Sequence, residues 1–437
     1  MKRNSCRVTG IVLFLGLGLL GSSPVETAEK HSEWSVPVNQ VLEWNQIFID
    51  TLIATNTANS ASQRLGAIVH TAIFDAYNGI ERRYTPMFFH NRAPNGASRR
   101  AAVIAAAYAA LVGLFPSRQP ALDDSYAASL AALSDDDEDG GQSRERGVAW
   151  GTEVAQAVLA WRATDGFSGS YPPFTGGTAV GQWRPTPPAF GAMSAQGLAF
   201  TAMFVLVNNV QFQPGPPRGL SSATYTDDFN AVKTLGRKTG STRTADQTAL
   251  APFWEGNAST HWNQAANQIA RTNHLSMSDS NRLLAVLNIA MADTAFTTWS
   301  GKRFYGAVPT EVTWRPVTSI PLADTDGNPD TAPDPDWLPL INTPSHPEYP
   351  AGHPSLNGAA ATVLLSHFDD DQIFTLTTIG QPSRTYTSIA QARSDGNNAR
   401  VWGGMHYPST VKISDAVGEA IANYVNRNSM RRLRGGR

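Results

Sequence analysis

Two short segments in the last third of the 437-residue chain carry residue types that can bind and activate an oxyanion. The first reads His-Pro-Glu-Tyr-Pro-Ala-Gly-His from His346 to His353, and an apolar helix-like run follows it. The second reads Arg-Val-Trp-Gly-Gly-Met-His from Arg400 to His406. A helix N-terminus offers free N–H groups and a positive dipole end, and the arginine and two histidines add further donors. This combination suits a tetrahedral oxyanion such as phosphate or vanadate.

Two more cationic positions precede these segments, namely Lys302 and the step Arg315-Pro316. Each piece alone is a weak signal. A single histidine in an apolar helix is more often a core residue than a ligand, and Arg400 with His406 could be a surface pair. The occurrence of all the pieces in one order indicates a single site.

The elements that must position these residues are helices. Apolar residues recur at steps of three and four, which is the helical period. This spacing predicts helices over residues 61–76, 101–115, 148–161, 264–269, 281–298 and 413–425. The connectors are rich in Pro and Gly, and strand-type alternation is scarce. We therefore expect an all-α protein of two packed helical bundles with few or no strands, and Lys302 is expected just after a helix.

The N-terminus has the pattern of a secretory signal peptide. Basic residues precede an apolar run over residues 10–21, which is shorter than the roughly 20 residues that a membrane span needs. Cleavage is expected between Ser23 and Ala28, so the mature chain would be secreted or periplasmic. The sole cysteine, Cys6, lies in this segment, and disulfides are not expected.

The predicted organisation is a signal peptide over residues 1–28, an N-terminal helical half over 29–235 and a C-terminal helical half over 236–426. A basic tail over 427–437 is expected to be a solvated end. The formal net charge of −2 gives no sign of a nucleic-acid or membrane partner.

Residues 324–330 alternate oxygen-bearing side chains like a calcium loop. Pro329 stands where such a loop needs glycine at its sixth position, and Pro335 stands where it needs glutamate at its twelfth. Calcium is therefore not expected as a cofactor.

The site segments resemble the vanadium-dependent haloperoxidase and type 2 phosphatidic-acid phosphatase superfamily. The family signature is Lys-x6-Arg-Pro, then Pro-Ser-Gly-His, then Arg-x5-His. The corresponding residues here are Lys302, Arg315-Pro316, Pro350-Ala351-Gly352-His353, and Arg400 with His406. Segments at residues 64–78, 183–188, 242–247 and 290–293 resemble the larger haloperoxidase branch, so the resemblance covers residues 38–425.

The resemblance implies vanadate as cofactor, with His406 as the ring-nitrogen ligand to vanadium and His353 as the acid/base group. It implies that Arg315, Arg400 and the Gly352 N–H hold the oxyanion. In the same family Lys302 would contact an oxygen of bound peroxide.

His346 lies seven residues before His353, where bromoperoxidases of the family carry histidine and the chloroperoxidase type carries phenylalanine. The resemblance therefore favours bromide or iodide over chloride. The alternative is that His346 only caps or hydrogen-bonds a loop.

This chain departs from the signature at two places. Ala351 replaces the signature serine, and we consider water or Ser355 as its replacement. Lys302 lies 13 residues before Arg315 instead of seven, so the spacing leaves open whether Lys302, Arg303 or neither reaches the site.

The favoured interpretation is an exported haloperoxidase that uses hydrogen peroxide, a halide and a small organic acceptor. One alternative is a phosphatase with His406 as nucleophile and His353 protonating the leaving group. The other is a non-catalytic oxyanion-binding protein with a degraded site.

Overall fold

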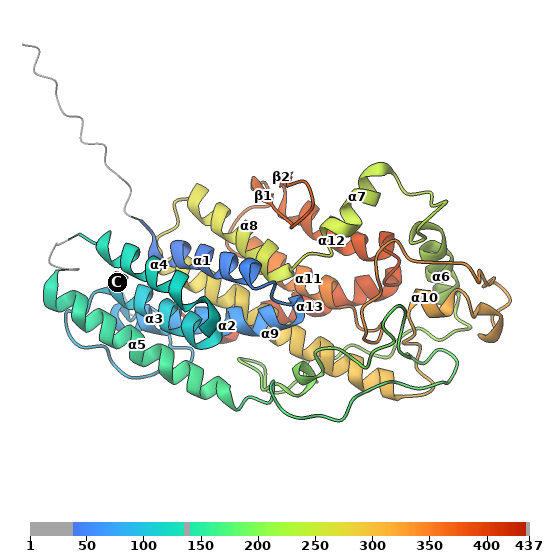
Figure 1. Cartoon of the computed structure of the whole chain (residues 1–437), viewed down its shortest axis with the longest axis horizontal. Helices are drawn as coiled ribbons and strands as arrows, with labels where there is room; N and C mark the ends of the chain where they lie inside the picture. The colour runs from blue at the N-terminus through green and yellow to red at the C-terminus, as the bar shows by residue number, and fades with distance from the viewer. Residues whose placement is uncertain (1–37, 135–139, 434–437) are drawn as a thin grey trace, which may run out of the picture. The chain divides into compact units, whose positions relative to one another are not determined.

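Helices joined by long loops make up the described chain (Figure 1). The computed structural model describes residues 38–134 and 140–433. The predicted signal peptide lies outside the described residues, as does the end of the basic tail from residue 434. The α-helices are α1 (Gln40–Ala54), α2 (Asn59–Glu81), α3 (Arg99–Leu114), α4 (Gln119–Ala131), α5 (Gly141–Ala163), α6 (Ala223–Leu235), α7 (Ala245–Phe253), α8 (Ala258–Thr272), α9 (Met277–Ala307), α10 (Pro316–Ser319), α11 (Gly352–Leu365), α12 (Ile389–Trp402) and α13 (Pro408–Asn428). Short 3-10 turns are η1 (Pro116–Arg118), η2 (Gln196–Phe200) and η3 (Ala323–Thr325).

The all-α prediction is confirmed. A single antiparallel pair, β1 (Phe374–Leu376) and β2 (Arg384–Tyr386), is the sheet found in the described chain. In the same residues no single helix is long and apolar enough to cross a bilayer. The bent pair Arg99–Leu114 and Pro116–Ala131 passes that test by length and composition alone.

Helix α9 corrects one expectation. The sequence pattern placed Lys302 after a helix ending at residue 298, whereas α9 continues to Ala307 and carries Lys302 within its last turns. The helix begins at the N-cap Ser276, whose side chain accepts from the Asp279 N–H. The helix continues because Trp299 and Tyr305 are buried, and tertiary packing outweighs the weak apolar periodicity of this stretch.

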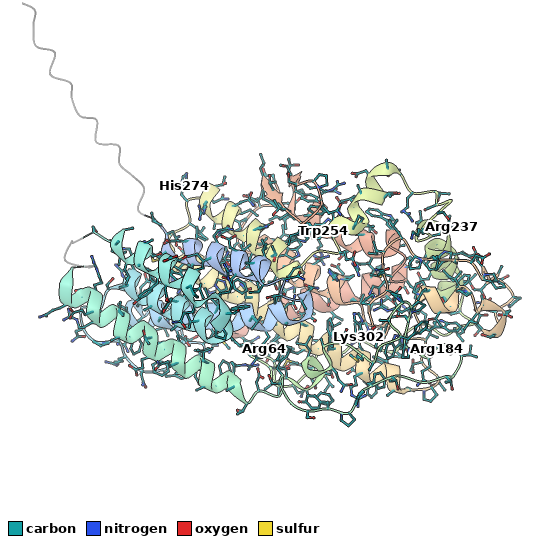
Figure 2. The ribbon with its side chains drawn as sticks, viewed as in Figure 1. Arg64, Arg184, Arg237, Trp254, His274 and Lys302 are labelled. Atoms are coloured by element: carbon teal, nitrogen blue, oxygen red, sulfur yellow. The ribbon has the colours of Figure 1, made fainter. Side chains whose placement is uncertain are left out.

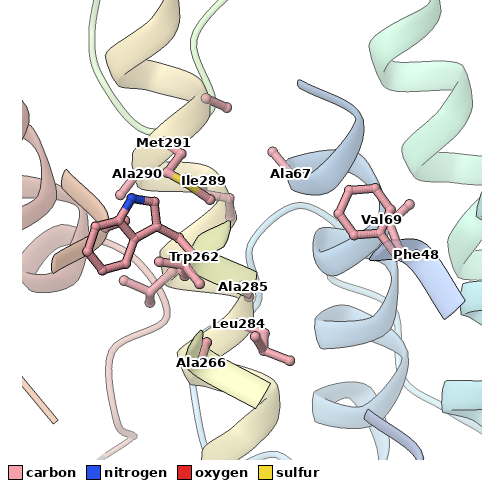
Figure 3. Close-up of a cluster of buried hydrophobic side chains, with 14 of the residues drawn as sticks. Phe48, Ala67, Val69, Trp262, Ala266, Leu284, Ala285, Ile289, Ala290 and Met291 are labelled. Carbon is pink, nitrogen blue, oxygen red and sulfur yellow. The ribbon is translucent and has the colours of Figure 1, made fainter. Parts of the chain in front are cut away.

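The hydrophobic core lies around α9. Helix α2 packs against α9, α3 and α5, and α11 and α13 pack against each other and against α9. Figure 3 shows part of this core, where Phe48, Val69, Trp262, Leu284 and Met291 are buried together. Burial of apolar area at roughly 25 cal/mol per Å² is the main force holding the helices together. Helices from both sides of residue 235 share this cluster, and the division into two halves stays a prediction.

Two buried carboxylates fasten loops to the central helices. Asp75 on α2 accepts hydrogen bonds from the backbone N–H groups of residues 87–89, at 2.7 to 2.8 Å. Asp293 on α9 accepts from the N–H groups of residues 204–206, at 2.7 to 3.0 Å. Because each carboxylate satisfies three backbone donors that would otherwise be buried without a partner, it fixes the path of its loop.

Candidate oxyanion site

A small cavity of about 210 Å³ lies at the N-terminus of α11 and beside the C-terminus of α12. Its walls are Asn59, Ser60, Ser194, Glu255, Trp299, Asn342, Pro344, His346, Gly352, His353, Arg400, Met405 and His406. Five sequence-predicted residues line it together, namely His346, Gly352, His353, Arg400 and His406. The other two, Lys302 and Arg315, lie behind the wall.

The start of α11 contributes backbone donors. The helix begins at Gly352, and its N-cap Ala351 has no side chain that could cap the first turn. The first-turn N–H groups of a helix have no intrahelical acceptor, so they are available to an anion. A Cβ at position 352 would lie 3.3 Å from the Trp299 ring, which explains the glycine by close packing.

Arg400 is the group most clearly prepared for an anion. It is 2% exposed in the last turn of α12, and its Nε and Nη1 have no hydrogen-bond partner in the described chain. Burial lowers the pKa of Arg400 to about 10, and the carboxylate of Glu255 opposes that shift. The side chain therefore stays charged at neutral pH, and a buried unpaired charge is costly unless an anion compensates it.

Arg315 is arranged differently. It is fully buried at the N-cap of α10, and its Nε and Nη1 donate to the His346 and Met405 carbonyls, both at 2.9 Å. Nη1 also lies 3.0 Å from His406 Nε2, and Nη2 lies 2.7 Å from His346 Nδ1. Arg315 thus holds the walls of the cavity and orients two histidines; its predicted contact with the oxyanion stays a prediction.

His406 is oriented by a carboxylate that the sequence analysis did not single out. Oε1 of Glu348 lies 2.8 Å from His406 Nδ1, and the same oxygen accepts from the Tyr407 N–H at 3.1 Å. Oε2 accepts from Thr410 Oγ1 at 3.0 Å. The Nδ1–H of His406 therefore donates to Glu348, so Nε2 carries the lone pair, which accepts from Arg315 Nη1 at 3.0 Å. A ligand at Nε2 would take the place of this contact. The position of Glu348 inside the His-Pro-Glu-Tyr-Pro segment was the signal that could have identified it.

Burial and the positive charges around His406 both favour its neutral form. Burial lowers its pKa well below the usual value, and the nearby Arg315, Lys302 and Arg400 lower it further. Burial raises the pKa of Glu348 to about 7, while Arg315 and Lys302 oppose the shift. A neutral imidazole is the form that can ligate a metal or attack phosphorus.

His353 lies across the cavity and has two partners for one ring nitrogen. Its Nε2 is 3.3 Å from Asn59 Nδ2 and 3.2 Å from the Gly256 carbonyl oxygen. The Oδ1 of Asn59 already accepts from Ala258 N and Gln63 Nε2, so its Nδ2 is turned to the histidine. Nε2 accepts from Asn59 when it lacks a proton and donates to Gly256 when it carries one. The ring keeps a partner in either tautomer, which suits an acid/base group.

Lys302 does not line the cavity. Its Nζ donates to the carbonyl oxygens of Pro347 at 2.6 Å and Glu348 at 3.3 Å (Lys302 is labelled in Figure 2). Burial lowers the pKa of Lys302 well below the usual value, and the positive charge of Arg315 adds to this. Its contact with peroxide stays a prediction, and its observed contacts stabilise the loop before α11. Arg303 stacks over Phe174 instead, with its guanidinium carbon 4.8 Å from the ring centroid.

The contacts of Ser355 and His346 bear on two further expectations. Ser355 cannot replace the missing serine, because its hydroxyl donates to the Gly352 carbonyl at 2.8 Å and bonds Thr298 at 2.9 Å. His346 does more than cap a loop, because it lines the cavity and lies 5.3 Å from the Trp299 ring, centroid to centroid.

The donor set fits an oxyanion and does not resemble a site for a metal cation. Within residues 38–134 and 140–433, no three His, Cys, Asp or Glu side chains gather at one point. The cavity instead presents the unpaired Arg400 fork, the first amides of α11 and two neutral histidines. These groups fit vanadate or phosphate. The negative oxygens of either anion would accept charge-assisted hydrogen bonds from the Nε and Nη1 of Arg400, which have no acceptor in the described chain.

Comparison with known proteins agrees with this geometry. The family model described as the VCPO second helical-bundle domain matches residues 282–435, which include every predicted site residue. The fold also matches the first bacterial vanadium-dependent iodoperoxidase with a TM-score of 0.77, at 22% identity over 92% of this chain and 99% of that chain. The described chain therefore shares its fold with a vanadium-dependent iodoperoxidase, and its residues 282–435 also match the VCPO domain model.

Two further solved structures match the fold with lower TM-scores. Holo-type and apo-type bacterial vanadium-dependent chloroperoxidases give TM-scores of 0.64 and 0.62 at 17% and 19% identity. Each match covers 84% of this chain and 92% of the other. A search of curated protein sequences finds no match. The haloperoxidase fold thus accounts for the helices on both sides of residue 235, as the resemblance implied.

Proposed function

We propose that this protein is a vanadate-dependent haloperoxidase that oxidises bromide or iodide with hydrogen peroxide. The observation that carries the proposal is the buried, unpaired guanidinium of Arg400, which faces His353 and His406 across one small cavity. Glu255 is the carboxylate that lines the same cavity, but within the described residues the Nε and Nη1 of Arg400 have no hydrogen-bond partner. The likeness of the fold to vanadium-dependent peroxidases supports vanadate as the anion.

Each residue has a distinct part. Arg400 and the first amides of α11 would hold vanadate by hydrogen bonds to its oxygens. Nε2 of His406 would hold vanadium. Glu348 accepts a hydrogen bond from the Nδ1–H, which keeps the proton on Nδ1 and leaves Nε2 deprotonated. Bound vanadate supplies Lewis acidity that makes peroxide electrophilic towards halide.

Proton movement is assigned to His353. Burial and the charge of Arg400 hold its pKa well below the usual value, so the ring is neutral and can accept a proton from incoming peroxide. The paired contacts with Asn59 and Gly256 let the proton sit on either nitrogen without loss of orientation. His353 can then return the proton to a departing oxygen.

The preference for bromide or iodide over chloride rests on His346 and on the iodoperoxidase match. His346 lines the cavity and places a polar ring beside Trp299, where a phenylalanine would present an apolar edge. We expect His346→Phe to raise the ratio of chloride to bromide turnover.

Export is a further part of the proposal. Its support is the basic and apolar N-terminal pattern, and mass spectrometry of protein recovered from the producing cells tests it. A mature N-terminus between residues 23 and 29 supports export, and an intact N-terminus in secreted or periplasmic fractions contradicts the cleavage.

The second candidate is a phosphatase. The same donors accept phosphate, and the neutral Nε2 of His406 is a competent nucleophile. A third is a non-catalytic oxyanion-binding protein, which the missing hydroxyl at Ala351 and the withdrawn Lys302 favour.

One pair of assays separates the three. Purified protein with orthovanadate and hydrogen peroxide should brominate a phenol dye, and His406→Ala should abolish this. Hydrolysis of p-nitrophenyl phosphate without bromination would establish the phosphatase. Failure of both reactions in a folded sample that still binds phosphate would establish the binding protein.

A further inference from the structure

A second, larger cavity adjoins the oxyanion cavity. Its volume is about 740 Å³, within the range of about 300–1,000 Å³ that small-molecule sites usually have. It lies between the end of α1, the loop from α7 to α8, and the loop after β1. Asn59 and Glu255 line both cavities, so the two share a wall. Figure 2 labels Trp254, which ends α7 next to this wall.

The larger cavity has apolar sides. Leu52, Ile53, Pro252 and Ile379 contribute aliphatic surface. Ile379 lies in the loop after β1 and is 71% exposed. Apolar walls with a few polar groups are the usual composition of a site for a small organic molecule.

The charge of the lining narrows the choice of molecule. Glu255 is the only acidic residue among the described residues that line this cavity, and no Lys or Arg joins it. The histidine present, His261, is buried, and burial lowers its pKa to about 4, so it is neutral. The lining therefore holds one carboxylate and no cationic side chain, which disfavours an anionic molecule and favours a neutral or cationic one.

We propose that this outer cavity binds the organic acceptor, an electron-rich aromatic molecule that is neutral or cationic, such as a phenol or an aromatic amine. The assignment rests on the proposed haloperoxidase function for the chemistry, and on the cavity alone for the binding. Hypohalous acid formed beside His353 would pass Asn59 and Glu255, which line both cavities, to reach the acceptor in the outer cavity. The ring carbon–halogen bond forms as the oxygen–halogen bond breaks, and the ring proton leaves with the hydroxide as water.

Binding is tested without turnover. Saturation-transfer NMR on the full chain, with neither vanadate nor peroxide present, measures binding of phenol, tyramine and 4-hydroxybenzoate. We expect phenol and tyramine to bind and 4-hydroxybenzoate to bind least. Equal binding of all three probes, or none, overturns the proposal.

Two variants locate the probe. Ile379→Ser should weaken phenol binding about fourfold, the effect of losing roughly one methylene-sized contact. Ile373→Ser is the matched control, because Ile373 is 66% exposed near the same strand but does not line the cavity. Glu255→Gln should reduce the preference for tyramine over phenol by up to about fivefold. Identical effects of Ile379→Ser and Ile373→Ser contradict the placement.

A competition experiment separates the two cavities. Inorganic phosphate should bind the oxyanion cavity and leave phenol bound, since the probes occupy different spaces. Displacement of phenol by phosphate in a competitive manner would place the probe in the inner cavity and overturn the proposal. These readouts need no vanadate. Probe binding can therefore succeed where haloperoxidase activity fails, and haloperoxidase activity can be present where probe binding fails.

Discussion

Oε1 of Glu348 lies 2.8 Å from Nδ1 of His406, and both side chains are buried. His406 lines the oxyanion cavity, and Glu348 does not. The contact fixes which ring nitrogen carries the proton. It also explains why a histidine surrounded by Arg315, Lys302 and Arg400 keeps an orientation that serves a ligand or a nucleophile. Carboxylates in this position commonly orient a metal-binding histidine and raise its basicity.

Glu348→Gln should weaken binding of orthovanadate by about 10- to 100-fold, the usual effect of losing such a carboxylate. The amide keeps the shape of the side chain but loses the charge that attracts the Nδ1–H. Vanadium-51 NMR titration measures the affinity. Thr410→Val, which removes only the hydrogen bond to Oε2, is the control and should have the smaller effect. Unchanged affinity in Glu348→Gln would show that His406 needs no such orientation.

Arg400→Gln should lower the affinity for phosphate without lowering the free energy of unfolding. Loss of hydrogen bonds to a charged group, each worth about 1.5–3 kcal/mol, should reduce phosphate affinity at least tenfold. The free energy of unfolding without anion should be unchanged or higher, because the unpaired buried charge disappears. Isothermal titration with phosphate and urea unfolding measure the two quantities.

Arg393 on the same helix is the matched control for Arg400. It pairs with Asp415 and Glu419 at 2.7 Å each. Arg393→Gln should lower the free energy of unfolding and leave phosphate affinity intact. Lower stability in Arg400→Gln together with unchanged phosphate affinity would mean that Arg400 is a structural residue.

Ala351→Ser should restore the signature hydroxyl. A serine there can donate to the oxyanion, worth about 0.5–1.5 kcal/mol, or cap α11, worth about 1 kcal/mol. We expect phosphate affinity to rise severalfold in a calorimetric titration. A gain in melting temperature with no gain in affinity would assign the hydroxyl to the helix cap alone.

The sequence predicted the helical class and the residues that meet at the cavity, because motif spacing and helical periodicity are local properties. It did not predict that Lys302 bonds the carbonyl oxygens of residues 347 and 348, since that depends on α9 continuing past residue 298. It also missed Asn59 at the start of α2 and Glu255 in the loop after α7, because only tertiary packing decides that they reach the site. Glu348 was visible in the motif, but its partner lies 58 residues away.

Stability should depend on pH through histidines remote from the cavity. Burial lowers the pKa of His70 to about 3, and its ring bonds Asn45 Oδ1 at 3.0 Å. The unfolded chain takes up a proton near pH 6.5 and the folded chain does not. This contribution to stability is complete above pH 6.5 and falls by about 1.4 kcal/mol per pH unit as the pH drops from 6.5 towards 3.

Other groups act in the opposite direction. Burial raises the pKa of Asp75 and of Asp293 to about 6, so their contribution to stability falls as the pH rises from about 4 to 6. The comparison is therefore made between the wild type and His70→Gln, which share these carboxylates. Urea unfolding at pH 7.5, 6.0 and 5.0 should show a shallower loss of stability in the variant below pH 6.5. Parallel curves would mean that His70 is protonated in the folded chain.

The most direct test of the oxyanion site is a stepwise titration of metal-free protein with orthovanadate in the presence of hydrogen peroxide and bromide. If His406 holds vanadate as proposed, bromide oxidation rises with each addition and levels off near one vanadate per chain. The His406→Ala variant should stay inactive throughout while remaining folded. Bromide oxidation that is absent at every vanadate concentration, or that is equal in wild type and His406→Ala, would contradict this proposal.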